Sequence, residues 1–330
     1  IEDLTTYLTS PDPQVIVISG AFDFVGSEGT ETAQGCDAYS CTPDNGGQAL
    51  LNGLQGCGDK ALYDITYDKA GAEGINVASD KTLVGLGTDT VLNGKGLRFV
   101  GVENIIVQNI AITNLNPQYV WGGDAIVFSG TSKIWVDHVT TSSLGRQHYS
   151  FGQESDTLIT ISNSFINGQT DYSATCDGHT YWALELVGSN DQITFYKNYV
   201  LNTSGRSPAL SGSTLFHAVN SVWESNSGHM LEGTDSGKGL FEGCAFKSIP
   251  NIADDGFVGG LFSSDEADVG LCSAALGRDC QTNVYTDSGP FSYKETAVLD
   301  AFQGLTVVDA DAAADVQDSV PKSAGNTLST

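Results

Sequence analysis

A short apolar pattern that recurs along most of the chain is the strongest constraint on its fold. It occurs six times after Asn76, as IIVQNI, IWVDHV, ITISNS, ITFYKN, LFHAVN and GLFEGC, ending at residues 110, 139, 164, 198, 220 and 244. Successive ends are 29, 25, 34, 22 and 24 residues apart. Such steps are typical of a solenoid, whereas the hairpins of a β-sandwich place strands about 8 to 12 residues apart. We therefore expect an all-β chain folded as a right-handed parallel β-helix, with irregular loop excursions and short peripheral helices.

The six runs also predict which side chains point inward. Each run is apolar or small at its first and third positions, and alternation along a strand places these two on the same face. Asn198 and Asn220 end two of the runs, where amide side chains can bond successive coils at a turn. Cys244 ends another run and is predicted to be a small, buried free thiol.

The solenoid is expected to organise the whole chain, residues 1–330, as a single domain. The start of the chain predicts a short helix followed by a buried strand at residues 15–18. Residues 26–60 are rich in glycine, hold three cysteines and show little periodicity. They predict a disulfide-tied loop excursion rather than a second domain. The acidic tail, residues 307–330, is expected either to lie along the flank of the solenoid or to fray.

The charge of the chain excludes several classes of partner. Its 14 basic and 40 acidic side chains give a formal net charge of −26, which repels nucleic acid and anionic lipid. No apolar run approaches the ~18 residues of a membrane span. The chain opens at Ile1 without a basic, apolar leader, so we expect a processed form. We predict no nucleic-acid partner and no membrane partner.

The cysteines favour an oxidising compartment. There are seven, so at least one thiol stays unpaired, and none of the spacings is that of a zinc site. Cysteines that lie close together beside turn residues in an acidic chain fit a secreted, extracellular protein. Asn202, in the sequence Asn-Thr-Ser, is a candidate glycosylation site.

Several longer motifs together resemble the fungal-type pectin lyases of the pectate lyase superfamily. They are YVWGGDAI, IWVDHVTTSSLGRQHY, DYSATCDG, YWALEL, TSGRSP, LFHAVN and CSAALGRDC, which occur in this order over most of the chain. The resemblance implies a carbon–oxygen lyase that cleaves α-1,4-linked, methyl-esterified galacturonan within the chain by β-elimination. It also implies unsaturated products, a monomeric enzyme and no cofactor.

Elimination requires a base for the C5 proton and positive charge for the enolate that develops on the C6 carbonyl. Arg206 in TSGRSP matches the catalytic arginine of the superfamily. Holding an arginine neutral near pH 7 costs roughly 7 kcal/mol, so a base role needs strong environmental help. A charged Arg206 that stabilises the enolate is the alternative, and the sequence leaves both roles open.

Asp124 in WGGDAI matches an aspartate that ligates calcium in the pectate lyases. Where those enzymes carry further acidic ligands, this chain has Arg146 and Ser150. A site that loses two carboxylates and gains a cation does not suit calcium. The resemblance thus implies that Arg146 pairs with Asp124 and supplies the charge of the metal, and no metal is predicted. The alternative is a buried ion pair that only braces the coil.

Trp121, Tyr181 and Trp182 match aromatic residues of the family's cleft, where flat rings can carry sugar faces. Two departures from the family are visible. Ala209 stands where many relatives have lysine, and the 26–60 excursion offers Tyr39 but no tryptophan.

The cysteine pairing of the family, carried across by position, implies three disulfides, namely Cys36–Cys57, Cys41–Cys176 and Cys272–Cys280. The remaining candidates for chemistry are given structural roles. Asp137 and His138, on opposite faces of a strand, are expected to brace adjacent turns. The other residues interpreted as structural or solvated are the histidines His148, His179, His217 and His229.

Three other functions are weighed against a pectin lyase. A calcium-dependent pectate lyase would need the acidic ligands that Arg146 and Ser150 replace. A galacturonan hydrolase would need a carboxylate pair, for which Asp171 and Asp177 are the nearest candidates. A pectin-binding β-helix without activity would not need Arg206, Asp124 and Arg146 together.

Overall fold

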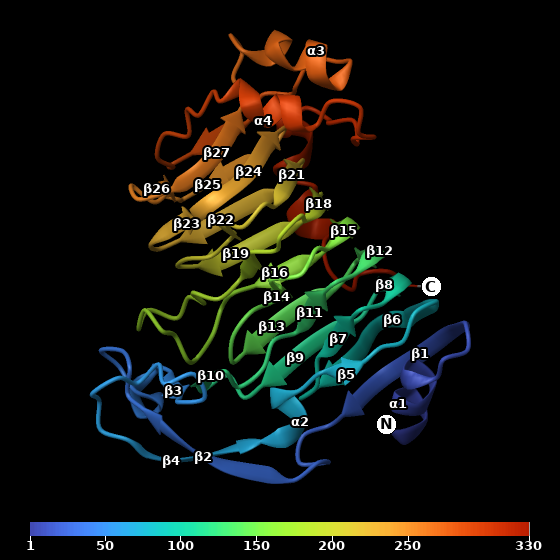
Figure 1. The fold of residues 1–330 in the computed structure, drawn as a ribbon, viewed down its shortest axis with the longest axis vertical. Coiled ribbons are helices and arrows are strands. Elements are labelled where there is room, and N and C mark those ends of the chain that lie inside the picture. Colours follow the sequence, from blue (N-terminus) through green and yellow to red (C-terminus); the bar gives the residue numbers. More distant parts are fainter. Residues whose placement is uncertain (330) are drawn as a thin grey trace.

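The computed structural model describes residues 1–329, and most of them belong to a parallel β-helix (Figure 1). Its coils stack along the long axis of the molecule, from the N-terminal end to α3 (Ser273–Leu276). Each of the five coils between residues 97 and 226 contributes one strand to each of three rows, which we call rows A, B and C. All pairs within these rows are parallel, as the spacing of the apolar runs predicts.

The rows contain strands of very different length. Row A is a separate six-stranded sheet made of β5 (Ile75–Asn76), β7 (Leu97–Val100), β11 (Ile126–Ser129), β14 (Tyr149–Phe151), β17 (Leu184–Leu186) and β20 (Ala209–Leu210). Row B is made of β8 (Glu103–Gln108), β12 (Ser132–Asp137), β15 (Thr157–Ser162), β18 (Gln192–Tyr196), β21 (Leu215–Val219), β24 (Thr234–Glu242) and β27 (Val258–Ser263). Row C is made of β9 (Ala111–Leu115), β13 (Thr140–Leu144), β16 (Phe165–Asn167), β19 (Tyr199–Thr203), β22 (Val222–Asn226), β25 (Ala245–Lys247) and β28 (Val284–Thr286).

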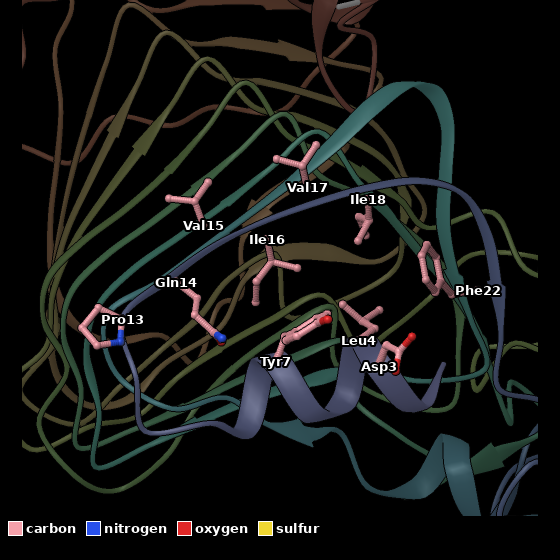
Figure 2. A pocket seen from close by; sticks show the side chains of 10 residues that line it. All are labelled: Asp3, Leu4, Tyr7, Pro13, Gln14, Val15, Ile16, Val17, Ile18 and Phe22. Atoms are coloured by element: carbon pink, nitrogen blue, oxygen red, sulfur yellow. The ribbon is translucent and has the colours of Figure 1, made fainter.

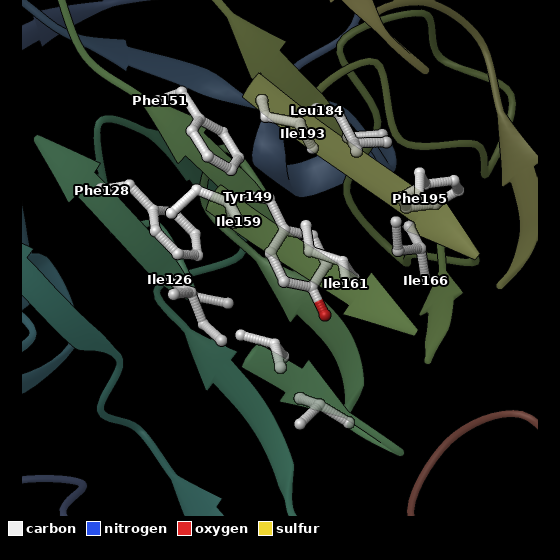
Figure 3. Close-up of a cluster of buried hydrophobic side chains, with 14 of the residues drawn as sticks. Ile126, Phe128, Tyr149, Phe151, Ile159, Ile161, Ile166, Leu184, Ile193 and Phe195 are labelled. Atoms are coloured by element: carbon white, nitrogen blue, oxygen red, sulfur yellow. The ribbon is translucent and has the colours of Figure 1, made fainter. Parts of the chain in front are cut away.

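Side chains from all three rows fill the inside of the solenoid. In the part drawn in Figure 3, isoleucines and aromatic rings of successive coils lie above one another, and the Phe128 and Phe151 rings stack with centroids 4.3 Å apart. Because each inward residue packs on its equivalents in the coils before and after, the core is one continuous column. A coil that lost its apolar inward residues would expose both neighbours.

The register of one run differs from the prediction. Ile193 pairs with Phe216 and Phe216 with Gly239, so the inward row passes through Phe216 rather than Leu215. The last three steps are therefore 34, 23 and 23 residues. Asn198 and Cys244 share one turn position, but Asn220 lies one residue earlier. Cys244 is buried and free, as predicted, and burial raises the pKa of its thiol to about 12.

The asparagines do bond successive coils. The side chain of Asn198 accepts from the backbone N–H of Ser164, at 2.8 Å, and donates to the carbonyl of Ile161, at 2.8 Å. Asn220 has a left-handed backbone, with φ of 52°, a conformation that asparagine tolerates better than most residues. Its amide donates to Gly243 and to Asp311 of the tail.

The N-terminal end is built from α1 (Glu2–Thr9), β1 (Gln14–Asp23) and the long β6 (Lys81–Asn93), which pairs with β1, β8 and β9. Within β1, Ile16 and Ile18 are buried, but Val15 and Val17 are 74% and 55% exposed. The prediction of a buried strand was wrong for the two valines, because alternation along β1 places them on the face opposite Ile16 and Ile18. A cavity of about 600 Å³ lies between α1 and β1 (Figure 2).

The excursion after β1 is more regular than predicted. β2 (Thr30–Cys36) pairs antiparallel with β4 (Tyr63–Asp68) and with β3 (Ala49–Leu51), which in turn pairs with β10 (Tyr119–Val120). The 3₁₀ turn Pro43–Asn45 and α2 (Lys69–Ala72) complete it. Disulfides join Cys36 to Cys57 and Cys41 to Cys176, the pairs that the family resemblance implies. The second disulfide ties the excursion to the loop between β16 and β17.

The C-terminal part covers one end and one flank of the solenoid. The 3₁₀ turn Val269–Cys272, α3 and α4 (Thr296–Ala301) follow β27, and the third implied disulfide joins Cys272 to Cys280. The tail then runs back along the coils as α5 (Ala313–Val316) and α6 (Val320–Ser323), and Leu328 bonds Asn109 near the N-terminal end. Lys247 also donates to the carbonyl of Gln317, so the tail contacts the coils at more than one place.

Asp137 and His138 brace the turns, as expected, but not from opposite faces. β12 ends at Asp137, and His138 has a left-handed backbone, with φ of 51°, so alternation along the strand no longer applies to it. Its Nδ1 lies 2.8 Å from Asp137 Oδ2. Gln108, Ser162 and Asn163 donate to the same carboxylate. Although burial opposes it, these hydrogen bonds lower the pKa of Asp137 to about 2.

A buried carboxylate gives a prediction for the pH dependence of stability. Burial and the neighbouring Asp191 raise the pKa of Asp156 to about 6. The native state therefore binds the proton more tightly than the unfolded state, and the stabilisation is lost as pH rises from about 4 to about 6. Burial lowers the pKa of His148 to about 3, which acts in the opposite direction over the same range. The difference in thermal midpoint between the parent and Asp156→Asn isolates Asp156. As pH rises from about 4 to about 6, the thermal midpoint of the parent should fall relative to that of Asp156→Asn. A difference that stays constant with pH would contradict the assignment.

Candidate active site

Charged side chains gather on the outer face of row A, at the end where each loop from a row C strand leads into the next row A strand. Asp124 and Arg146 precede β11 and β14, Glu185 lies in β17, and Arg206 precedes β20. Leu184 and Leu186 fill the core, so the alternation of β17 directs Glu185 outward. The outward register continues from Ser150 through Glu185 to the small Ala209 and on to Glu232 after β23 (His229–Leu231).

Arg206 bridges two carboxylates of this row. Its Nη1 donates to Glu185 Oε1, at 2.7 Å, and its Nε donates to Glu232 Oε1, at 3.0 Å. The Arg206 side chain is 25% exposed, so solvent still reaches the guanidinium. Gly205 allows this arrangement, because a Cβ at residue 205 would meet the ring of Tyr181 at 2.3 Å.

Arg146 contacts the carboxylates of Glu185, which it shares with Arg206, and Asp124. Its Nη2 donates to Glu185 Oε2, at 2.7 Å, and its Nη1 lies 3.4 Å from Asp124 Oδ2. Its guanidinium carbon is 3.9 Å from the centre of the Trp121 ring, a cation–π contact. The other oxygen of Asp124 accepts from the backbone N–H of Gln147, at 2.8 Å. Burial raises the pKa of Asp124, while Arg146 and Gln147 act to lower it.

The structure thus brings together the three residues proposed for catalysis and adds one that the sequence analysis missed. Glu185 contacts both arginines with one oxygen each. It stands in the motif YWALEL, and its place between two apolar residues of a short strand could have indicated an outward carboxylate. Its pairing with Arg146 and Arg206 depends on the conformation of two separate loops.

Glu232, His229 and Tyr181 form a second group, in which the sequence analysis had placed only Tyr181 in the site. The Tyr181 hydroxyl donates to Glu232 Oε2, at 2.5 Å, and His229 Nε2 lies 2.8 Å from the same oxygen. Although burial opposes it, hydrogen bonds from His229 and Tyr181 and the charge of Arg206 lower the pKa of Glu232. The hydrogen bond to Glu232 in turn raises the pKa of His229. His229 therefore belongs to the site and is not a solvated surface histidine.

The aromatic candidates line the same site. Trp121 is 39% exposed beside Arg146, and the guanidinium carbon of Arg206 is 5.0 Å from the Trp182 ring centre and 6.0 Å from that of Tyr181. The excursion positions Trp182, because the buried Gln48 accepts from its indole N–H at 3.0 Å. Burial raises the pKa of Tyr39, although the charges of Arg206 and Arg146 act to lower it. The excursion therefore also brings a phenol close enough to both arginines to feel their charge.

The donor set does not suit a calcium ion. The guanidinium of Arg146 lies between Asp124 and Glu185, at 3.4 and 2.7 Å, where a cation bound by both carboxylates would have to lie. Within residues 1–329, no group of three or more acidic, histidine or cysteine side chains is arranged to hold a metal ion. We therefore derive no chemical step through a metal.

The remaining candidates lie elsewhere in hydrogen-bonded positions. Asp177 accepts from Ser173, Thr175 and Ser227, and His179 Nδ1 faces the Asp177 carbonyl within the same loop. His217 is buried, with Nε2 2.8 Å from Glu242 Oε1. His148 is buried, with Nδ1 2.8 Å from the Thr141 hydroxyl.

None of the helices between residues 1 and 329 is long and apolar enough to cross a membrane.

Comparison with known proteins agrees with this fold and site. The family model described as pectate lyase matches residues 50–312, so the chain belongs to the pectate lyase family. It is 70% identical over 329 residues to the "Probable pectin lyase E" of Aspergillus niger, covering 100% of this chain and 89% of that one. It is 47% identical to "Pectin lyase A" of Emericella nidulans, covering 99% and 88%. These relatives place it among the fungal pectin lyases.

Solved structures of distant relatives confirm the parallel β-helix. A pectate lyase from Paenibacillus sp. 0602 superposes with a TM-score of 0.61 at 14% identity, covering 99% of this chain and 90% of that one. A pectate lyase from Bacillus sp. N165, solved with trigalacturonate, gives a TM-score of 0.58 at 17% identity, covering 98% and 90%. At this identity the similarity establishes the fold alone.

Proposed function

We propose that Arg206 and Arg146 carry out the β-elimination by which this pectin lyase cleaves methyl-esterified galacturonan. The observation that supports the proposal is the pair of guanidinium groups joined by Glu185 on the outer face of row A. Trp121, Tyr181 and Trp182 lie beside these groups and offer flat rings for the sugar faces. A glycoside hydrolase would need two carboxyl groups that flank the scissile bond. In this site Asp124, Glu185 and Glu232 are instead paired with arginines.

The reaction places its charge on the ester carbonyl. A base removes the C5 proton, the electron pair forms the C4–C5 double bond, and the glycosidic oxygen on C4 leaves with the bonding pair. Negative charge develops on the C6 carbonyl oxygen between these events, and positioned cations stabilise it. Arg206 and Arg146 supply two such cations at one place. The leaving oxygen must be protonated, and the hydroxyl of Tyr181, which shares the Glu232 carboxylate with Arg206, is the candidate donor.

The contacts of Arg206 bear on its two possible roles. Glu185 and Glu232 both accept from its guanidinium, and nearby negative charge favours the charged form. Arg206 can therefore stabilise the enolate in the site as it stands, and in that role another group must accept the C5 proton. A role as the base requires that bound substrate separate the guanidinium from at least one of these carboxylates. Either role places Arg206 at the reacting centre.

The charge of the site supports activity without calcium. We expect the ultraviolet absorbance of unsaturated products to rise on highly esterified pectin in the presence of EDTA, at the rate seen without it. The reason is that Arg146 already lies between Asp124 and Glu185. Adding calcium should give no increase. Activity abolished by EDTA and restored by calcium would contradict the proposal and indicate a metal-dependent site.

The disulfides and the substrate also bear on the compartment in which the enzyme acts. Methyl-esterified pectin is the substrate, and three disulfides fit an extracellular protein. We propose a single-domain, secreted monomer that acts within the pectin chain. Asn202 lies in β19 and is partly exposed, which is compatible with a glycan four residues from Arg206.

A further inference from the structure

We propose that Glu185 makes the cleft selective for the methyl ester, because it occupies the arginine donors that a free galacturonate carboxylate would otherwise bind. The inference rests on the proposed function, since it concerns the substrate of the same site. It names a residue whose role is to exclude one form of the polymer.

The geometry of Glu185 is that of an internal carboxylate ligand. Oε1 accepts from Arg206 Nη1 and Oε2 accepts from Arg146 Nη2, both at 2.7 Å. Its side chain is 17% exposed, so it is held at the floor of the site rather than free in solvent. A guanidinium fork is well suited to a carboxylate because two N–H groups can meet two oxygens. Here Glu185 already takes an N–H from each fork.

The charge of the site acts in the same direction. With His229 counted as neutral, Asp124, Glu185 and Glu232 carry three formal negative charges against two positive charges on Arg146 and Arg206, a formal net charge of −1. A substrate carboxylate would add a further negative charge beside these three, and like charges placed together disfavour a binding partner strongly. The neutral carbonyl of an ester adds none. It can still accept a hydrogen bond from an arginine N–H that Glu185 leaves free.

The neighbours of Glu185 leave room for this role. Ser150 and Ala209 flank it in the outward row, and both side chains are small and uncharged. Neither supplies a cation that would offset the additional carboxylate. The exclusion therefore depends on Glu185 itself, and Glu185→Gln should weaken it while conserving the size of the side chain and one acceptor oxygen.

The test compares two substrates under the same conditions. We would measure kcat/KM with EDTA on highly esterified and on largely demethylated pectin, and inhibition by trigalacturonate, for the parent, Glu185→Gln and Glu103→Gln. Glu103 is an exposed glutamate of row B that pairs with Lys133, so its variant loses the same charge away from the site. We expect Glu185→Gln to raise the ratio of kcat/KM on demethylated to esterified substrate by roughly tenfold or more. Trigalacturonate should inhibit it more strongly, and Glu103→Gln should match the parent.

The outcomes separate this inference from the proposed function. If the parent forms unsaturated products but Glu185→Gln keeps the parent's ratio and inhibition, Glu185 only braces the arginines and the inference is overturned. If Glu103→Gln shifts the ratio equally, the exclusion comes from net charge and the inference is overturned as well. A parent that forms no unsaturated product from esterified pectin would instead overturn the proposed function. Should Glu185→Gln fold poorly, Glu185→Ala removes the same charge from a partly exposed position and answers the same question.

Discussion

Arg206→Ala should lower kcat on esterified pectin by roughly 10³-fold or more, the loss expected when a group that stabilises charge in the transition state is removed. The fold should tolerate the change. Glu185 keeps its contact with Arg146, and Glu232 keeps Tyr181 and His229, so neither carboxylate is left without a partner. The thermal midpoint should therefore change little while turnover nearly disappears.

Arg206→Lys is the matched control for this result. Lysine keeps the positive charge but has no planar fork, so it cannot meet Glu185 and Glu232 in the geometry of Nη1 and Nε. We expect a loss in kcat of roughly 10²-fold, intermediate between the parent and alanine. Added guanidinium ion should partly restore Arg206→Ala, which a purely structural role would not allow. An alanine variant that keeps a large part of its turnover would remove Arg206 from the mechanism.

The repeating part of the fold could be predicted because its signal is local. Within a coil, inward residues such as Ile134 and Val136 are two positions apart, and the next coil repeats them at Ile159 and Ile161. One run was placed a residue out of register for a physical reason. The outward His217 is buried under Phe302 of the C-terminal part, so burial no longer distinguishes the inner face from the outer face there.

The site could be predicted only as far as single motifs carry it. Arg206, Asp124 and Arg146 each stand in a motif that resembles the family, and the structure brings them within contact of one set of carboxylates. Glu185 also stands in one of these motifs, YWALEL, but the motif assigned it no role, and Glu232 stands in none of them. Their function arises from register across coils, which places both beside Ala209, and from loops whose conformation the sequence pattern does not determine.

Arg146→Ala decides whether the pair with Asp124 serves catalysis or only braces the coil. If Arg146 supplies the charge that calcium supplies in the metal-dependent enzymes, its loss should cost about 3 kcal/mol or more of transition-state stabilisation. KM should also change, because the Trp121 ring loses the guanidinium 3.9 Å away. If the pair is a brace, the loss strands Asp124 and should destabilise the fold by about 3 to 5 kcal/mol, while the remaining folded enzyme turns over nearly normally.

The two single variants and the double variant separate these cases, because the structure makes them unequal. Asp124→Ala leaves Arg146 with Glu185, whereas Arg146→Ala removes the cation paired with Asp124 and leaves this carboxylate with neutral donors. A brace therefore predicts that Arg146→Ala is the less stable single variant and that adding Asp124→Ala to it recovers much of the loss. Catalysis predicts that the double variant stays as inactive as Arg146→Ala at any stability. Measuring kcat and the thermal midpoint on all three gives the answer, and recovered stability with undiminished kcat would remove both residues from the chemistry.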